Sequence, residues 1–332
     1  MARNLEAYVG NGFLAAILPV ARKEAGCFVF VPTVIRLDGR TARRQGVRRL
    51  GCLVGMKDGA SVASKTMRLA GRTAIVTGGG SGMGETISAL FALEGASVVV
   101  ADADTKRSNS VVDMISGEGG KALAVTVDVA DEHQVIKMVE TSRAHFMAID
   151  ILVNCAAVAE FLPAEEITSE RWRRMIDIDM GGVFYCCREA GKEMIKRNYG
   201  KIINFGSTAG LTGIPYMSHY TAAKHGVVGL TKALATEWGK YNVNVNCICP
   251  GATLTPMLLS ATTPAYRAER ADRIPLNRLA TTQEQADVAL FLASSDSDYV
   301  TGNVICTDGG ILALAASTSS SALKGESFRK TS

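Results

Sequence analysis

Short runs of apolar residues alternate with amphipathic stretches along the chain from residue 67 onward. Each run is apolar throughout, which is typical of strands buried on both faces of a parallel sheet. Between the runs, apolar positions recur at steps of three and four residues, as Val135, Met138 and Val139 do, and this spacing predicts helices. The predicted strands cover residues 72–77, 96–101, 122–127, 149–154, 201–205, 243–249 and 303–307. The predicted helices cover residues 82–94, 105–118, 131–146, 177–197, 218–239 and 284–294.

This alternation predicts the fold class. Strands that alternate with helices form a parallel sheet covered on both faces, because the crossovers between parallel strands are right-handed and carry the helices. We therefore expect an α/β protein with a doubly wound, Rossmann-type parallel sheet of about seven strands. It should form a single domain over residues 67–315.

The two ends of the chain lack this pattern. Residues 1–66 carry 11 Lys and Arg against 4 Asp and Glu, and they show no clear periodicity. Three interpretations of this basic N-terminal extension stay open: an organellar transit peptide, a disordered arm, or a translation start set too early, with Met67 as the true start. The Ser-rich residues 316–332 are expected to form a disordered tail.

Composition and charge exclude several function classes. The net charge of +4 comes from the N-terminal extension, so the slightly acidic remainder has no electrostatic footprint for nucleic acid. No apolar run reaches the ~18 residues of a membrane span. We expect a cytoplasmic protein unless the extension directs it to an organelle. The eight Cys include no CxxC pair and the four His have no metal-ligand spacing, so we expect buried, reduced thiols and no metal site.

A glycine-rich turn joins the first strand after residue 67 to the first helix, and it reads TGGGSGMG over residues 77–84. Glycine lets the backbone turn tightly and approach a pyrophosphate closely, and free N–H groups at the start of the helix then bind the phosphates. We expect a dinucleotide to bind here, on Gly78, Ser81, Gly82, Met83 and Gly84.

The ends of the next two strands carry acidic residues that could contact the adenosine half of a dinucleotide. Asp102 stands about 20 residues beyond the turn, where a carboxylate can accept both ribose hydroxyls and would repel a 2′-phosphate. This position favours NAD over NADP. Asp128 and Val129 end the third strand, where the adenine could lie. For each aspartate, a role as a helix cap is the alternative.

The candidate reaction centre consists of Ser207, Tyr220 and Lys224. Tyr220 and Lys224 are four residues apart on one predicted helix, which places them on the same face. An ammonium beside a phenol stabilises the phenolate and lowers its pKa, so Tyr220 could exchange a proton with an alcohol or carbonyl near neutral pH. Ser207 follows a strand, and its hydroxyl could hold the same substrate oxygen.

Together these motifs resemble the classical short-chain dehydrogenase/reductase family. The resemblance runs from about Leu69 to Gly310 and rests on the glycine-rich turn, Asp128-Val129, ILVN at 151–154, Ser207, YTAAK at 220–224, PGATLT at 250–255 and DGG at 308–310. It implies an NAD(P)-dependent oxidoreductase in which Tyr220 is the general acid/base. Lys224 would bind the nicotinamide ribose, and Ser207 would orient the substrate oxygen. The resemblance also implies that Pro250, Gly251, Thr253 and Thr255 line the nicotinamide. Asn154 and Ala156 would flank the cofactor at the fourth strand.

The chain departs from the family pattern at two places. After the strand ILVN the family commonly has Asn-Asn-Ala-Gly, whereas this chain has NCAA over residues 154–157. Asp179 stands where the family usually has a catalytic Asn, which supports a helix kink and helps to hold a water on the proton path from the Lys. We expect activity to survive with Asp179, with a shifted pH profile.

The resemblance therefore implies an NAD-dependent oxidoreductase that interconverts a small-molecule secondary alcohol and a ketone. Two other classes stay open: a non-catalytic NAD-binding sensor or scaffold, and epimerase or dehydratase chemistry with a retained cofactor. Apolar residues on several faces of the helices over 177–197 and 218–239 indicate that these helices are buried on several sides. The resemblance implies that these are the association faces of a homodimer or homotetramer, and packing within one subunit is the alternative. Residues 252–275 could form a mobile lid over a partly hydrophobic pocket, with Glu160, Phe161 and His219 in its wall.

Overall fold

The computed structural model describes residues 8–10, 13–24, 27–37 and 67–314. The chain divides into two units, Met1–Ala63 and Ser64–Ser332. In the first unit, β1 (Tyr8–Gly10), β2 (Phe13–Glu24) and β3 (Cys27–Leu37) form an antiparallel sheet in that order. The sequence pattern predicts no strands there, because residues 13–24 and 27–37 are apolar over much of their length and show only a weak two-residue alternation.

The three interpretations of residues 1–66 stay predictions. The prediction of a disordered tail concerns residues 316–332, which lie outside the described residues. No helix in the described ranges is long and apolar enough to cross a membrane. The cytoplasmic location stays a prediction as well.

The second unit is built on one sheet of seven parallel strands, in the order β10-β9-β8-β7-β4-β5-β6. The strands are β4 (Thr73–Thr77), β5 (Ser97–Asp102), β6 (Lys121–Thr126), β7 (Ile151–Asn154), β8 (Gly200–Phe205), β9 (Val243–Pro250) and β10 (Val304–Thr307). This order confirms the predicted doubly wound sheet. The direction of winding reverses between β4 and β7, and ligands of such sheets bind outside the strand ends at this point.

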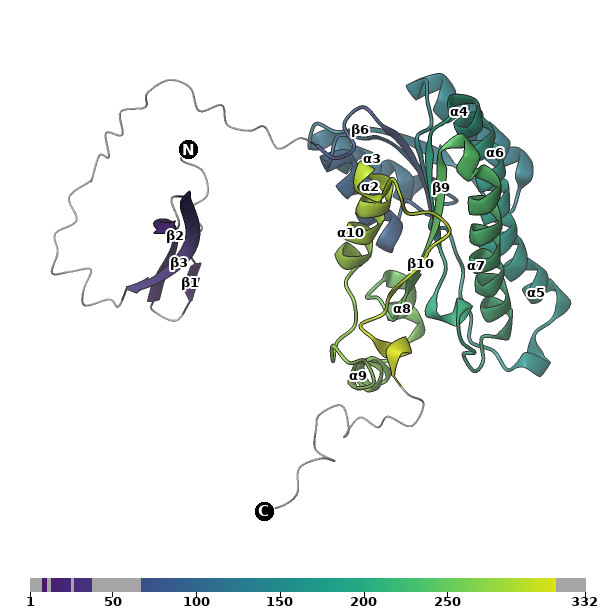
Figure 1. The fold of residues 1–332 in the computed structure, drawn as a ribbon. Helices are drawn as coiled ribbons and strands as arrows, with labels where there is room; N and C mark the ends of the chain where they lie inside the picture. The colour runs from purple at the N-terminus through teal and green to yellow at the C-terminus, as the bar shows by residue number, and fades with distance from the viewer. Residues whose placement is uncertain (1–7, 11–12, 25–26, 38–66, 315–332) are drawn as a thin grey trace, which may run out of the picture. The chain divides into compact units, whose positions relative to one another are not determined.

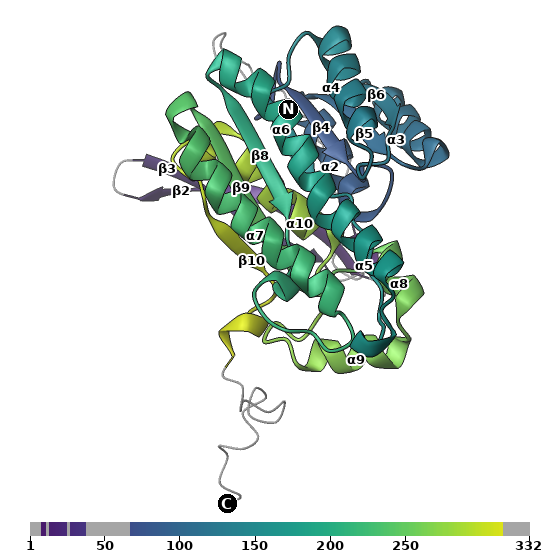
Figure 2. The ribbon, with the colours of Figure 1, turned by 90° about the vertical axis from the view of Figure 1, so that its right-hand side faces the viewer.

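Three main helices cover each face of the sheet (Figures 1 and 2). One face carries α2 (Gly82–Leu93), α3 (Thr105–Gly117) and α10 (Thr282–Ala293), and the other carries α4 (Glu132–Phe146), α6 (Gly182–Arg197) and α7 (Ser218–Trp238). Ile75 and Val99 belong to the core under α4, α6 and α7, whereas Val76 and Val98 belong to the core under α2, α3 and α10. Because successive strand residues enter opposite cores, the strands are apolar throughout.

The structure contains three helices that the sequence analysis did not predict, namely α5 (Ser169–Ile176), α8 (Pro256–Ala261) and α9 (Pro264–Asp272). Helices α8 and α9 bury no residue, and the apolar stripe of α5, formed by Trp172, Met175 and Ile176, is only two turns long. The predicted helix over 177–197 begins earlier than expected, because α5 continues through a π-helical turn, η2 (Asp177–Gly181), into α6. Residues 252–275 therefore contain two short helices, and their mobility stays a prediction.

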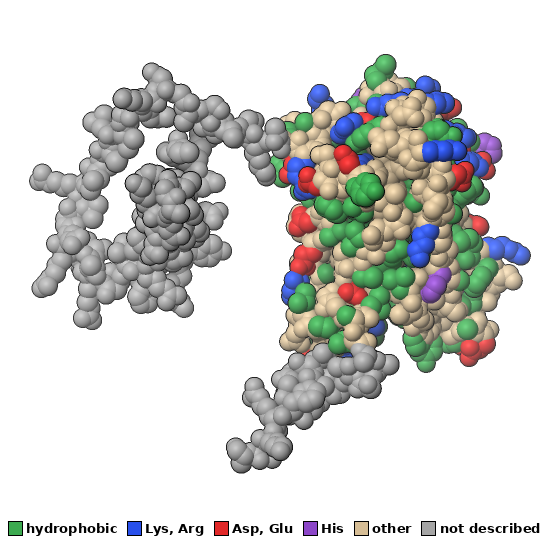
Figure 3. Space-filling model, viewed as in Figure 1, with side chains coloured by type: hydrophobic (Ala, Val, Ile, Leu, Met, Phe, Trp, Pro, Cys, Tyr) green, Lys and Arg blue, Asp and Glu red, His purple; other side chains and the backbone are tan. Residues whose placement is uncertain are grey.

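The surface of the second unit mixes the two signs of charge. Figure 3 shows Lys, Arg, Asp and Glu side chains around the margins of one face and hydrophobic side chains nearer its centre. The expectation that nucleic acid is not a partner stays a prediction.

Candidate active site

The glycine-rich turn lies between the carboxyl end of β4 and the start of α2. Gly78 has a φ of +64°, and a Cβ there would lie 2.8 Å from the backbone N of Ala156. A Cβ on Gly84 would lie 2.1 Å from the carbonyl oxygen of Gly78. These two positions therefore accept only glycine without a backbone shift. Among the described residues, Ser81 at the start of α2 makes no side-chain capping bond, which leaves the first N–H groups of α2 free for phosphate oxygens.

A cleft of about 550 Å³ opens beside this turn, at the carboxyl ends of the strands. Most of the residues predicted to bind a cofactor line it, namely Gly78, Ser81, Gly82, Met83, Asp102, Asp128, Val129, Ala156, Tyr220, Lys224 and Thr255. An adjoining cavity of about 170 Å³ is lined by Ser207, Pro250, Gly251 and Thr253, and also by Tyr220. Tyr220 thus faces both spaces. The glycine turn, the uncapped helix and the volume of the cleft fit a dinucleotide.

Asn154 is predicted to contact the cofactor, but its side chain points into the core. It is 2% exposed, and its Nδ2 donates to Asn204 Oδ1 at 2.8 Å. Asn204 Nδ2 in turn donates to Thr231 Oγ1 at 3.0 Å. This chain of hydrogen bonds joins β7, β8 and α7 behind the site. The Asn154 side chain therefore supports the site from within and does not line either space.

The two strand-end aspartates are placed in the cleft without capping the helices that follow them. Asp102 accepts hydrogen bonds from the backbone N–H groups of Gly80 at 3.0 Å and Asp104 at 2.9 Å. Asp104 is the residue that caps α3, and Asp131 is the one that caps α4. Asp128 accepts from the N–H of Ala130 at 3.0 Å. The capping alternative is thus wrong for both, and Asp102 also ties the glycine turn to β5.

Tyr220 and Lys224 lie together on α7, as their spacing predicts. Lys224 Nζ is 5.5 Å from the centre of the Tyr220 ring. Burial raises the pKa of Tyr220, and the charge of Asp179 raises it further, while the Lys224 ammonium and a hydrogen bond with Ser207 lower it. The net direction is upward, so the expected lowering by Lys224 is outweighed by burial. The sequence could not show how deeply the phenol is enclosed.

Lys224 forms a buried ion pair with Asp179. Lys224 is 2% exposed and Asp179 is fully buried, and Nζ lies 3.2 Å from Asp179 Oδ2. Nζ also donates to the carbonyl oxygen of Phe205 at 3.1 Å, and Asp179 Oδ1 accepts from the N–H of Val158 at 2.8 Å. Asp179 stands in the π-helical turn η2, a local distortion that is frequent at functional sites. The turn aims its carboxylate at Lys224.

The ion pair changes the pKa of both partners. Burial raises the pKa of Asp179, and the Lys224 ammonium only partly opposes this effect. Burial alone would lower the pKa of Lys224, but the charges of Asp179 and Tyr220 outweigh it and raise the pKa. The raised pKa of Lys224 keeps the ammonium charged near neutral pH.

The three residues proposed for the pocket wall occupy different places. Phe161 lines the 170 Å³ cavity. His219 is fully buried, with neither ring nitrogen hydrogen-bonded to another described residue, and its Nε2 lies 3.7 Å from Glu160 Oε2. Glu160 also pairs with Arg171. His219 and Glu160 are therefore not among the residues that line the cavity.

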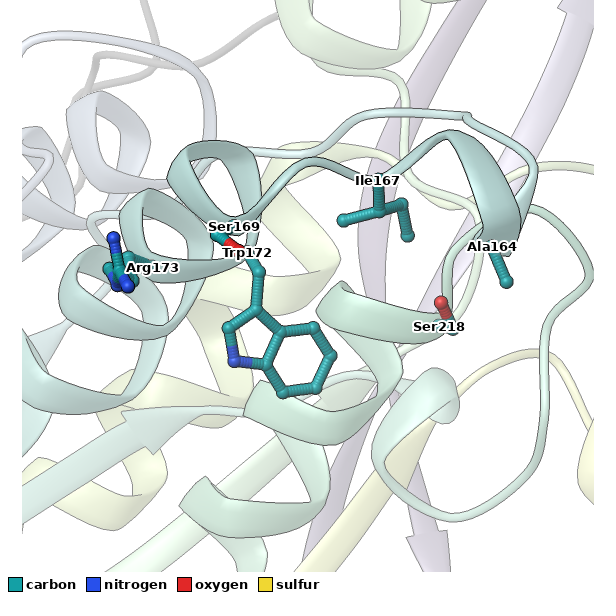
Figure 4. A pocket seen from close by; sticks show the side chains of 6 residues that line it. All are labelled: Ala164, Ile167, Ser169, Trp172, Arg173 and Ser218. Carbon is teal, nitrogen blue, oxygen red and sulfur yellow. The ribbon is translucent and has the colours of Figure 1, made fainter.

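A separate hollow of about 310 Å³ lies between the turn η1 (Ala164–Glu166), α5 and the start of α7 (Figure 4). Its lining residues are Ala164, Ile167, Ser169, Trp172, Arg173 and Ser218. Arg173 is the one ionisable side chain among them, so this hollow offers no acid/base pair. Ser207, Tyr220 and Lys224 at the cleft and its adjoining cavity therefore remain the candidate reaction centre.

The prediction that the cysteine thiols are buried is correct for some of the described cysteines. Cys186, Cys187, Cys247 and Cys249 are buried, as expected, whereas Cys306 on the edge strand β10 is exposed. Burial raises the pKa of the Cys155 thiol to about 12. Among the described residues, no group of three His, Cys, Asp or Glu side chains is arranged to hold a metal ion.

Comparisons with known proteins agree with this geometry. Residues 78–312 match the family model described as enoyl-(acyl carrier protein) reductase. The 3-oxoacyl-[acyl-carrier-protein] reductase of Thermotoga maritima is 37% identical over 246 residues, which cover 74% of this chain and 100% of that protein. The cyclohexanol dehydrogenase of an Acinetobacter species is 37% identical over 239 residues, 72% of this chain and 94% of that one.

A solved structure has the same fold. The gluconate 5-dehydrogenase of Burkholderia cenocepacia, crystallised in complex with NADP and tartrate, superimposes with a TM-score of 0.72 at 31% identity. The match covers 75% of this chain and 98% of that one.

Proposed function

The chain belongs to the short-chain dehydrogenase/reductase family, and from this premise we propose that it is an NAD-dependent dehydrogenase that interconverts a small secondary alcohol and a ketone. The observation that carries the proposal is the position of Tyr220, which faces both the dinucleotide-sized cleft and the smaller cavity. A phenol at this junction can touch a substrate oxygen while the substrate carbon faces the cofactor. Relatives of this chain include both alcohol dehydrogenases and ketone reductases.

The proposed chemistry divides the work among three side chains. In alcohol oxidation, Ser207 would hold the hydroxyl oxygen and Tyr220 Oη would take its proton. Lys224 stays charged and buried, so it stabilises the phenolate that Tyr220 needs in order to act as a base, and it would also hold the nicotinamide ribose. A bound nicotinamide would supply the acceptor for the hydride that leaves the alcohol carbon. The alcohol is thereby oxidised to a ketone and one proton is released.

The test is turnover of the full chain, followed as reduced-nicotinamide absorbance. A panel of secondary alcohols, polyols and sugar acids would be offered with NAD and with NADP. The proposal expects formation of reduced cofactor with at least one class. A bound but unreacted cofactor across the whole panel would favour the sensor or scaffold class. Substrate conversion without net reduction would favour epimerase or dehydratase chemistry.

NAD is the proposed cofactor because Asp102 presents a carboxylate to the cleft. Arg107 lines the same end of the cleft, and its Nε lies 3.3 Å from Asp104 Oδ2, so this cation is already paired. The Burkholderia cenocepacia relative was crystallised with NADP, so the cofactor preference of this chain has to be measured. A 2′-phosphate would meet the Asp102 charge, whereas ribose hydroxyls would donate to it.

Replacing Asp102 with Asn should reduce the preference for NAD over NADP by roughly tenfold, since hydrogen bonds to a charged group contribute about 1.5–3 kcal/mol. The ratio of kcat/KM with NAD to that with NADP measures this change. Asp113→Asn, an exposed substitution on α3, is the matched control. If the unmodified protein already used NADP in preference to NAD, the assignment would be wrong.

A homodimer or homotetramer is also part of the proposal. Phe184 on α6 is 40% exposed and Trp172 on α5 is 43% exposed, both on the side of the sheet that carries α7. Association faces carry contiguous apolar patches, and we propose that these two exposed side chains belong to one. Light scattering should give a mass of two or four chains, and a monomer at micromolar concentration would contradict this part of the proposal.

A further inference from the structure

The 170 Å³ cavity beside Ser207 and Tyr220 contains a single charged side chain. Its wall is largely apolar, with Met83, Phe161, Met257 and Leu258 in the lining, and Arg270 of α9 completes it. No Asp or Glu is among the lining residues. The cavity therefore has the polarity of a site for an apolar molecule with one anionic end.

The charge of Arg270 has no acidic partner among the described residues. Arg267 on the same helix also lacks one, but its guanidinium donates to the carbonyl and hydroxyl oxygens of Thr262. The recorded contact of Arg270 is with the Tyr266 ring, whose centre lies 5.9 Å from the guanidinium carbon. By contrast, Arg273 pairs with Glu269 at 2.7 Å, and Arg278 pairs with Glu284 at 2.5 Å. Arg270 is only partly exposed, so its charge is also incompletely hydrated. An anion bound in the cavity would supply the missing counter-charge.

The chemistry of a single guanidinium selects among anions. Its planar fork of N–H donors matches the two oxygens of a carboxylate. One arginine neutralises one carboxylate, whereas a phosphate dianion would keep an uncompensated charge in the apolar cavity. Ligand pockets usually measure about 300–1,000 Å³, so the small cavity also favours a small substrate.

We propose that the substrate is a small hydroxy acid, or the corresponding oxo acid, whose carboxylate binds Arg270 while its alcohol carbon lies at Ser207 and Tyr220. The inference rests on the proposed function and names the substrate class of the same site. Arg270 acts in it as a specificity-determining residue.

The test compares hydroxy acids with their own methyl esters. A series from 3- to 6-hydroxy acids varies the distance between carboxylate and alcohol, and each ester removes the charge at nearly constant shape. The unmodified protein should use one of the acids at least tenfold better than its ester, judged by kcat/KM. Arg270→Gln should lower this acid-to-ester ratio by about 10- to 100-fold, as expected for charge-assisted hydrogen bonds. Arg273→Gln, three residues along the chain, should leave the ratio unchanged.

Several results would overturn the inference. Equal kcat/KM for acids and esters in the unmodified protein would show that the site does not recognise a carboxylate. The proposal of a dehydrogenase would still stand. Better use of phosphate monoesters than of acids would also overturn the inference.

If no alcohol were turned over, the proposed function would fail, and calorimetric titration with the same hydroxy acids would still decide the role of Arg270. The inference then expects binding that Arg270→Gln weakens at least tenfold. Equal binding, or none, would overturn it.

Discussion

Replacing Tyr220 with Phe is expected to reduce turnover by about 10²- to 10⁴-fold, the usual contribution of a positioned general acid or base. The substitution removes one hydroxyl and keeps the ring that lies over Lys224 at 5.5 Å, so the packing of α7 should be preserved. Cofactor binding should persist, because the glycine turn and Asp102 are unchanged. The loss should therefore fall on kcat and leave cofactor affinity nearly constant.

Reduced-nicotinamide absorbance measures kcat, and fluorescence titration measures binding of the reduced cofactor. Tyr299→Phe is the matched control, since that side chain is fully exposed. Because burial raises the pKa of Tyr220, alcohol oxidation by the unmodified protein should still be increasing as the pH rises above neutrality. Retained turnover in the Phe variant, with the same pH profile, would show that another group moves the proton.

The sequence was sufficient to predict the sheet and the main helices because both depend on local patterns. Neighbouring strand residues such as Val98 and Val99 point to opposite faces of the sheet and are both apolar. In the structure their side chains enter two separate cores. Helices α8 and α9 bury nothing, so periodicity could not reveal them. The signal that could have found them is a Thr followed by Pro, at Thr255 and Thr263, because Thr caps a helix and Pro suits its first turn.

The site was predictable where residues follow strands or share a helix face, as Asp102, Tyr220 and Lys224 do. What depends on tertiary contacts was not predictable. The side chain of Asn154 turns into the core because Asn204 offers it a buried partner. Arg270 was overlooked because nothing in its sequence neighbourhood distinguishes it from Arg267 or Arg273; only the folded chain places it in the cavity wall.

Replacing Lys224 with Met should reduce the free energy of unfolding by about 3–5 kcal/mol, the usual cost of leaving one member of a buried ion pair alone. Asp179 would then be a fully buried carboxylate whose remaining bond is from Val158 N–H. Combining Lys224→Met with Asp179→Asn should recover much of this loss, because Asn keeps an acceptor for Val158 without the charge. Urea unfolding of the single and double variants measures the coupling. Additive losses would mean that the 3.2 Å contact contributes no interaction energy.

The same pair predicts an unusual pH dependence of stability. Because burial raises the pKa of Asp179 above its ordinary value of 3.8, the folded state holds more protons than the unfolded state between that value and the folded pKa. Stability then falls as pH rises through this window, opposite to the behaviour of most paired carboxylates. Asp179→Asn should remove this fall, whereas Asp177→Asn, an exposed neighbour in the same turn, should retain it. Identical pH profiles for the unmodified protein and Asp179→Asn would mean that Asp179 has the same pKa folded and unfolded. In that case the surrounding groups, Lys224 first among them, would fully offset the desolvation of the carboxylate, and ionisation of Asp179 would leave the stability of the fold unchanged.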